Sequence, residues 1–191
     1  MNSTQLAIII PAYKATFLEQ TLSSIAMQTN HSFHLYVGDD ASSDSIEEIC
    51  RNFKNKISLS YHRFNNNLGK RDLVAHWERC INLSKNEPYI WLFSDDDIMP
   101  YDAVAQVENC IKTTGSLFMR LPLCVINENN EISHNNPKFY KSISNYKELL
   151  MDKLEGKVST AAIEYIFHRS IYEENAGFVH FPLAWCSDDA T

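Results

Sequence analysis

The chain lacks three features that mark common protein classes: paired cysteines, an excess of positive charge and long apolar runs. Its five cysteines include no CxxC pair, and an odd number cannot all form disulfides within one chain. We therefore expect reduced thiols, as in the cytoplasm. The formal net charge of −7 argues against a nucleic-acid partner, because nucleic-acid binders neutralise phosphates with lysine and arginine.

The apolar run near the N-terminus spans about six residues, too few for a signal peptide or a membrane span, and no basic region precedes it. The seven histidines form neither an HxH nor an HExxH motif, which argues against zinc. The chain also has no repeat and no linker long enough to separate domains. We expect one cytoplasmic domain over residues 1–191. Attachment to the inner face of a membrane, through sequence outside this chain, stays open.

The composition supplies enough apolar material for a core, with 45% hydrophobic and 12% aromatic residues. The first half alternates between apolar runs and segments with helical spacing. There the expected strands cover 6–13, 33–38, 57–64 and 89–93, and the expected helices cover 17–26, 44–53, 70–84 and 102–113. In the second half we expect strands over 116–126 and 158–168 and a helix over 145–154.

Repeated strand and helix units predict an α/β fold with a mainly parallel sheet flanked by helices. Ligands of such sheets bind beyond the carboxyl ends of the strands. The stretches "PAYK" (11–14), "DDASSD" (39–44) and "SDDD" (94–97) each follow an expected strand, so we expect them along one edge, facing a cleft. The last residues, "AWCSDDAT", end where Ser187 is placed to cap a helix, and we therefore expect a C-terminal truncation.

Three consecutive carboxylates, Asp95, Asp96 and Asp97, follow the apolar strand at 89–93. At such short separation they repel one another, which raises at least one pKa unless a cation offsets the charge. Magnesium or manganese suits this stretch, because these ions take a few carboxylate oxygens and leave positions for water and phosphates. The alternative is a solvated acidic turn that caps the next helix.

A second acidic stretch ends the strand at 33–38. We expect Asp44 to cap the following helix, with Glu47 three residues later as in a capping box. For Asp39 and Asp40 two interpretations are balanced: they stabilise a turn, or they accept hydrogen bonds from a base or from sugar hydroxyls.

Four stretches occur along the chain in this order: "IIIPAYKATFLEQTLSSIAMQT", "LYVGDDASSDS", "NNNLGKR" and "YIWLFSDDDIMP". Taken together, they resemble the family 2 glycosyltransferases, and the resemblance covers nearly the whole chain. These inverting enzymes move a sugar from a nucleotide diphosphate onto an acceptor. The resemblance implies a GT-A, Rossmann-like fold with a nucleotide-binding half at 1–100 and an acceptor-side half at 101–191.

On the nucleotide side, the resemblance places Pro11, Ala12 and Tyr13 in the loop against the base, with Tyr13 as a stacking partner. Core packing is the alternative for Tyr13. Asp40 matches the residue that reads the base edge, and Asp39 is then expected to support the turn.

The acidic turn at 95–97 resembles the DxD element of the family. Asp95 matches a ribose-contacting acid, Asp96 matches the metal ligand, and Asp97 is either a ligand or a helix cap. The sequence departs from the commoner pattern because Phe93 stands where many members carry the first acid. Lys70 and Arg71 are shifted candidates for nucleotide contacts and are otherwise exposed residues of a helix.

On the acceptor side, "FPLAWCSDDAT" resembles the acidic pair that precedes a helix late in the fold. Asp189 would be the general base that takes the proton from the acceptor hydroxyl, and Asp188 would contact the acceptor or support the base. Helix capping is the alternative for both. Trp185, four residues before Asp189, is the candidate sugar-stacking platform.

The resemblance implies a metal-dependent inverting glycosyltransferase that takes a UDP-sugar and modifies a glycan or lipid-linked acceptor in surface polysaccharide synthesis. Two alternatives stay open. A module that binds nucleotide sugars or cations without transfer would share the same site. A sugar nucleotidyltransferase would need a glycine-rich basic loop after the first strand, and "PAYKATF" contains no glycine.

Overall fold

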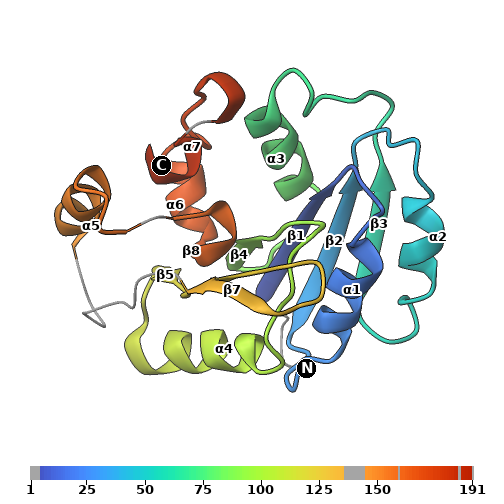
Figure 1. Cartoon of the computed structure of the whole chain (residues 1–191), viewed down its shortest axis with the longest axis horizontal. Helices are drawn as coiled ribbons and strands as arrows, with labels where there is room; N and C mark the ends of the chain where they lie inside the picture. The colour runs from blue at the N-terminus through green and yellow to red at the C-terminus, as the bar shows by residue number, and fades with distance from the viewer. Residues whose placement is uncertain (1–4, 136–144, 159, 185, 191) are drawn as a thin grey trace.

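The computed structural model describes residues 5–135, 145–158, 160–184 and 186–190 (Figure 1). Within these residues the main sheet has six strands in the order β3-β2-β1-β4-β8-β5. β1 to β4 are parallel neighbours, whereas β8 is antiparallel to β4 and β5 is antiparallel to β8. The strand bounds are β1 Leu6–Ala12, β2 Phe33–Asp39, β3 Leu59–Arg63, β4 Tyr89–Leu92, β5 Phe118–Arg120 and β8 Tyr165–His168.

Helices cover both faces of the sheet, and a separate hairpin of β6 (Cys124–Ile126) and β7 (Ile132–Asn135) lies beside it. Figure 1 shows α5 at the left end of the molecule, apart from the sheet. None of the described helices is both long enough and apolar enough to cross a lipid bilayer. The helix bounds are α1 Leu18–Ala26, α2 Ile46–Arg51, α3 Leu73–Ile81, α4 Ala103–Thr114, α5 Tyr146–Leu154, α6 Arg169–Glu174 and α7 Ser187–Ala190, with 3₁₀ turns η1 Ala162–Glu164 and η2 Pro182–Ala184.

The central strand β1 is buried on both faces, which explains its continuous apolar sequence. Ile8 and Ile10 point into the cluster that α1, α2 and α4 complete. Ile9, between them, points into the cluster on the opposite face, which includes residues of α3. In register, Ile8 lies between Leu35 of β2 and Trp91 of β4. The alternation of side chains thus buries every residue of the strand's middle.

The packing of α3 onto the sheet depends on Gly38 of β2. A Cβ atom at this position would lie 2.4 Å from the Cys80 Sγ atom of α3, closer than real contacts allow. A residue without a side chain therefore lets the helix approach the strand backbone. This close approach brings one side of α3 to the carboxyl end of the sheet.

Two expected strands of the second half are shorter than predicted. The strand expected over 116–126 is divided into β5 and β6, with Pro122 between them. Proline has no N–H to donate to the ladder with β8, which accounts for the end of β5. Of the strand expected over 158–168, only β8 pairs with neighbours. Its first part forms η1, where the Ala161 N–H donates to the Glu164 carboxylate at 2.9 Å.

The expected cap of α2 is wrong. Ser45, not Asp44, is the N-cap residue, and no side chain there accepts a hydrogen bond from the helix. The Asp44 carboxylate instead accepts the Ala15 N–H at 2.8 Å, from the loop after β1. Glu47 therefore completes no capping box. The expected helix at 70–84 is also shorter: it begins after Asp72, whose carboxylate accepts the Ala75 N–H at 2.9 Å.

Candidate functional site

The carboxyl ends of β1, β2 and β4 open onto one cavity of about 1100 Å³. The strand order predicts this convergence, because these three strands are parallel neighbours. Other lining residues come from the β6 segment, including Val125, and from the start of η1. Among the predicted site residues, those that line the cavity are Pro11, Tyr13, Asp40, Lys70, Asp95, Asp96 and Asp97.

Asp95 ties the turn after β4 to the loop after β1. One of its carboxylate oxygens accepts the backbone N–H groups of Tyr13 at 2.8 Å and Lys14 at 3.0 Å. Burial raises the pKa of Asp95, whereas these two N–H groups act in the opposite direction. Tyr13 itself is 46% exposed, so the core-packing alternative for this side chain is wrong.

Asp96 and Asp97 carry the excess negative charge of the cavity. Asp96 is exposed and accepts a hydrogen bond from the Ser94 hydroxyl. Burial, followed by the charges of Asp96 and Asp95, raises the pKa of Asp97 to about 6. Neither residue caps the next helix, since the N-cap of α4 is Asp102. Within the described part of the chain, no lysine, arginine or histidine forms an ion pair with these aspartates.

Asp39 is held by hydrogen bonds within the protein. Its side chain is fully buried and accepts hydrogen bonds from the Ser42 N–H at 2.8 Å, the Tyr61 hydroxyl at 2.6 Å and Arg63 at 2.7 Å. Burial, followed by the hydrogen bond to Asp39, raises the pKa of Tyr61. These partners belong to the turn after β2 and to β3, so Asp39 holds the end of the sheet together.

Asp40 faces the cavity and holds the loop before α3. Its carboxylate accepts the N–H groups of Leu68 and Gly69, both at 2.8 Å, and a hydrogen bond from Arg79. The residue is only 2% exposed. His76 of α3 lies beside it and also lines the cavity.

Sequence reasoning missed Arg79 and His76. They lie three residues apart on one face of α3, a spacing that brings side chains together on a helix. The helical spacing of residues 73–81 indicates that the two side chains share a face. It does not indicate that they lie beside Asp40. Trp77 also lines the cavity, and the segment 123–130 closes it from the second half. No motif in the sequence marks that segment.

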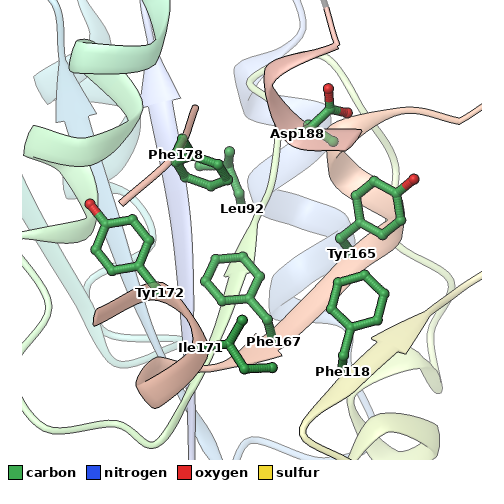
Figure 2. Close-up of a pocket in the computed structure, with 9 residues that line it drawn as sticks. Leu92, Phe118, Tyr165, Phe167, Ile171, Tyr172, Phe178 and Asp188 are labelled. Carbon is green, nitrogen blue, oxygen red and sulfur yellow. The ribbon is translucent and has the colours of Figure 1, made fainter. Parts of the chain in front are cut away.

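Five predicted site residues lie outside the cavity or outside the described part. Ala12 is fully buried in β1, and Arg71 is exposed without lining the cavity. Asp188 lies at the rim of a second cavity of about 50 Å³, among aromatic side chains that include Phe118 and Phe167 (Figure 2). Asp189 belongs to α7, but the position of its side chain is not among the described features, and Trp185 lies outside the described residues.

The residues present fit a divalent ion shared with a substrate. No group of three or more histidine, cysteine or acidic side chains in the described ranges forms a closed metal site. Magnesium and manganese need only one or two carboxylates when phosphates and water complete the coordination. Asp96 and Asp97 supply such oxygens beside the cavity.

The sequence profile of one protein family, described as "Glycosyl transferase family 2", matches residues 7–174. This match covers most of the chain. The chain belongs to glycosyl transferase family 2. No curated protein matches the sequence of this family 2 chain.

Solved structures share the fold of this family 2 chain. TarS 1–349 of S. aureus in complex with UDP is 16% identical, with a TM-score of 0.71, over 97% of this chain and 53% of that one. TarS 1–349 in complex with UDP-GlcNAc is 16% identical, with a TM-score of 0.70, over 92% and 49%. The mannosyltransferase PcManGT of Pyrobaculum calidifontis, in complex with GDP-Man and Mn²⁺, is 17% identical, with a TM-score of 0.65, over 97% and 50%.

These similarities confirm the predicted GT-A fold, with its mixed and mainly parallel sheet between helices. The family 2 chain spans about half the length of the solved structures that it matches. At identities of 16% and 17%, the likeness establishes the arrangement of the backbone and leaves substrate and metal to be argued from the site.

Proposed function

We propose that this chain is the GT-A domain of a metal-dependent inverting glycosyltransferase. In this proposal it transfers a sugar from UDP to a glycan or lipid-linked acceptor, in the cytoplasm, for surface polysaccharide synthesis. The observation that carries the proposal is the convergence of Tyr13, Asp40 and Asp96 on one cavity. This convergence supplies an aromatic face for a base, an acceptor for its N–H groups and a carboxylate beside the place for a diphosphate.

The nucleotide would lie across the carboxyl ends of β1, β2 and β4. The exposed ring of Tyr13 is free to stack on a base, and Pro11 lies next to it in the same wall. Asp95 holds the loop that carries Tyr13 and would contact the ribose. Lys70 lines the cavity as a cation for the phosphates. In this reading residues 1–100 form the nucleotide-binding half.

Asp96 and Asp97 would hold a magnesium or manganese ion. The ion, when bound, offsets the charge that develops on the departing nucleotide diphosphate. The comparison with PcManGT supports this assignment, because that structure contains Mn²⁺. The two carboxylates orient the donor, and Asp97 must lose its proton before it can bind the ion.

The acceptor would approach from the half formed by residues 101–191. Inversion requires a base on the side of the sugar opposite the leaving group. We assign this role to Asp189 in α7, which takes the proton from the acceptor hydroxyl, with Asp188 and Trp185 contacting the acceptor. The wall formed by residues 123–130 belongs to the same half and faces the acidic turn.

The test is nucleotide release by the chain of residues 1–191. Incubation with a panel of UDP-sugars and acceptor glycans should release UDP in the presence of Mn²⁺ or Mg²⁺ and not in the presence of EDTA. Asp189→Asn should bind UDP with unchanged affinity in calorimetry and release none from the sugar. A folded chain that binds no nucleotide with either metal would contradict the proposal.

A second candidate is a donor-binding module that does not transfer sugar by itself. It would use the same cavity, since Tyr13, Asp40 and Asp96 line it whether or not transfer follows binding. Binding of UDP together with no release from any sugar would support this candidate. A nucleotidyltransferase is disfavoured because Asp95 already occupies the backbone N–H groups of Tyr13 and Lys14, which a triphosphate would need.

A further inference from the structure

Asp40 meets the cavity with most of its hydrogen-bonding capacity already used. A carboxylate has about four lone-pair positions, two on each oxygen. Oδ1 accepts the Leu68 N–H at 2.8 Å and a hydrogen bond from Nη2 of Arg79, and Oδ2 accepts the Gly69 N–H at 2.8 Å. Oδ1 is therefore saturated, and Oδ2 keeps one position. Because Asp40 is 2% exposed, only a ligand atom placed directly against it can use that position.

Arg79 is fixed so that it cannot leave Oδ1 to a ligand. Its Nη1 donates to the Asn66 side chain at 3.2 Å, and its Nη2 also donates to the Asn66 carbonyl at 3.0 Å. The guanidinium carbon lies 3.9 Å from the centre of the Phe64 ring. A planar, multiply bonded guanidinium loses little entropy when it holds a carboxylate, in contrast to a lysine.

His76 completes the support of Arg79. Its Nδ1 accepts the Arg79 Nε–H at 3.0 Å, which requires a neutral ring. Burial lowers the pKa of His76 to about 4, so the ring is neutral near pH 7. His76 therefore stays an acceptor for the Arg79 Nε–H near pH 7.

We propose that Arg79 determines the specificity for the nucleobase, by leaving Asp40 a single free acceptor position. Uracil presents one ring N–H between two carbonyl groups, and one acceptor satisfies it. Guanine presents a ring N–H and an adjacent amino group, and it needs two acceptors side by side. Arg79 occupies the second of these, so the site takes UDP in preference to GDP. The inference rests on the proposed function, since it assumes that Asp40 meets the base.

Binding to the unmodified chain tests the base preference directly. With Mn²⁺ present, calorimetry should give an affinity for UDP at least about tenfold higher than for GDP, because the unmatched amino group of guanine stays buried. UDP methylated at N3 of uracil lacks the ring N–H and should bind about 10- to 100-fold more weakly than UDP. Equal affinities for UDP and GDP, or for UDP and its N3-methyl form, would overturn the inference.

Variants of Arg79 test whether this residue sets the preference. Arg79→Met keeps an aliphatic stem over the Phe64 ring and releases Oδ1, so the ratio of UDP to GDP affinity should fall by about tenfold. Arg79→Lys, which keeps a cation beside Asp40, should retain more of the preference. Arg51→Met is the matched control, because among the described residues Arg51 pairs with Glu47 alone, on the exposed side of α2.

The readout is the ratio of the two affinities, which a merely structural loss would not change. An unchanged ratio in a folded Arg79→Met chain would overturn the role of Arg79. If that variant does not fold, Asn66→Ala removes one support of Arg79 and should lower the ratio by a smaller factor; an unchanged ratio there has the same meaning. Failure of the unmodified chain to bind UDP and GDP alike would instead contradict the proposed function.

Discussion

The two acidic turns of the sheet have similar sequences and opposite electrostatic environments. In "GDDAS" each aspartate is matched by an arginine, Asp39 by Arg63 and Asp40 by Arg79. In "SDDDI" Asp95 accepts two backbone N–H groups, whereas Asp97 is partly buried and, after that, repelled by Asp96 and Asp95. Arginines pair with both aspartates of the first turn, whereas no basic side chain among the described residues pairs with the aspartates of the second.

The difference separates carboxylates whose charge is matched within the protein, Asp39 and Asp40, from Asp96 and Asp97, which have no basic partner among the described residues. A buried aspartate whose lone pairs are occupied stabilises the loops that it contacts. A carboxyl group with a raised pKa beside a large cavity marks a candidate site for a ligand. The role of aspartates that follow a strand can therefore be assigned only when their hydrogen-bond and ion-pair partners are known.

The largest expected effect is the loss of metal-dependent binding in Asp96→Asn. An amide is a much weaker ligand than a carboxylate for magnesium or manganese, so the affinity for UDP in the presence of Mn²⁺ should fall by about 100-fold or more. Titration calorimetry with Mn²⁺, and with EDTA in its place, measures this change. Binding of UDP by the variant with unchanged manganese dependence would refute the metal assignment.

The matching change in the completed turn should affect stability. Asp39→Ala leaves the Ser42 N–H and the Tyr61 hydroxyl without their buried acceptor, so the free energy of unfolding should fall by about 2–3 kcal/mol. Arg63 is 47% exposed at its side chain and can turn to water, which limits the loss. Urea denaturation measures the difference. Asp96→Ala is the control, and a loss as large as that of Asp39→Ala would end the distinction between the two turns.

The buried first half follows closely from the sequence. β1 to β4 alternate with α1 to α4 as predicted, because continuous apolar runs and helical spacing both reflect burial between two layers. The ends of helices were less predictable. Asp44 has the sequence features of a cap, yet its carboxylate is drawn to the Ala15 N–H by a contact that only the folded chain creates.

The site was predictable only where its residues follow strands. Asp40 and Asp96 lie where the parallel order of β1, β2 and β4 requires. Arg79 was not predictable as a partner of Asp40, because the two are 39 residues apart and meet only after α3 has packed on β2. The wall at 123–130 comes from a hairpin outside the main sheet, and its sequence carries no ligand motif.

A smaller effect should appear on lowering the pH. The pKa of Asp97 is raised from 3.8 to about 6, so its proton competes with a metal below that value. The affinity for Mn²⁺ and UDP should fall by about tenfold between pH 7 and pH 5. In the metal-free chain the sign is reversed: a raised folded-state pKa favours the folded state as the pH falls from about 6 towards 3.8.

Asp97→Asn isolates the effect of the Asp97 proton on the free energy of unfolding. In the metal-free state, this variant should lose more stability than the unmodified chain as the pH falls from 6 to 4, because the opposing contribution of Asp97 is gone. His76 acts oppositely, because a folded-state pKa lowered from 6.5 to about 4 removes stability as the pH falls through that interval. Urea denaturation at several pH values resolves the two. Identical pH profiles for the variant and the unmodified chain would show that Asp97 is not the titrating group.

The smallest expected effect tests the position of the Asp40 carboxylate through a glycine. A Cβ atom at Gly69 would lie 2.8 Å from Oδ2 of Asp40, the oxygen that keeps a free acceptor position. Gly69→Ala should displace that carboxylate and weaken UDP binding by about three- to tenfold. Gly115→Ala is the control: with φ at +62° and open space around it, it should lower stability by about 1 kcal/mol and leave UDP binding unchanged. Equal losses of UDP affinity in both variants would mean that backbone strain, and not the position of Asp40, governs the binding of the base.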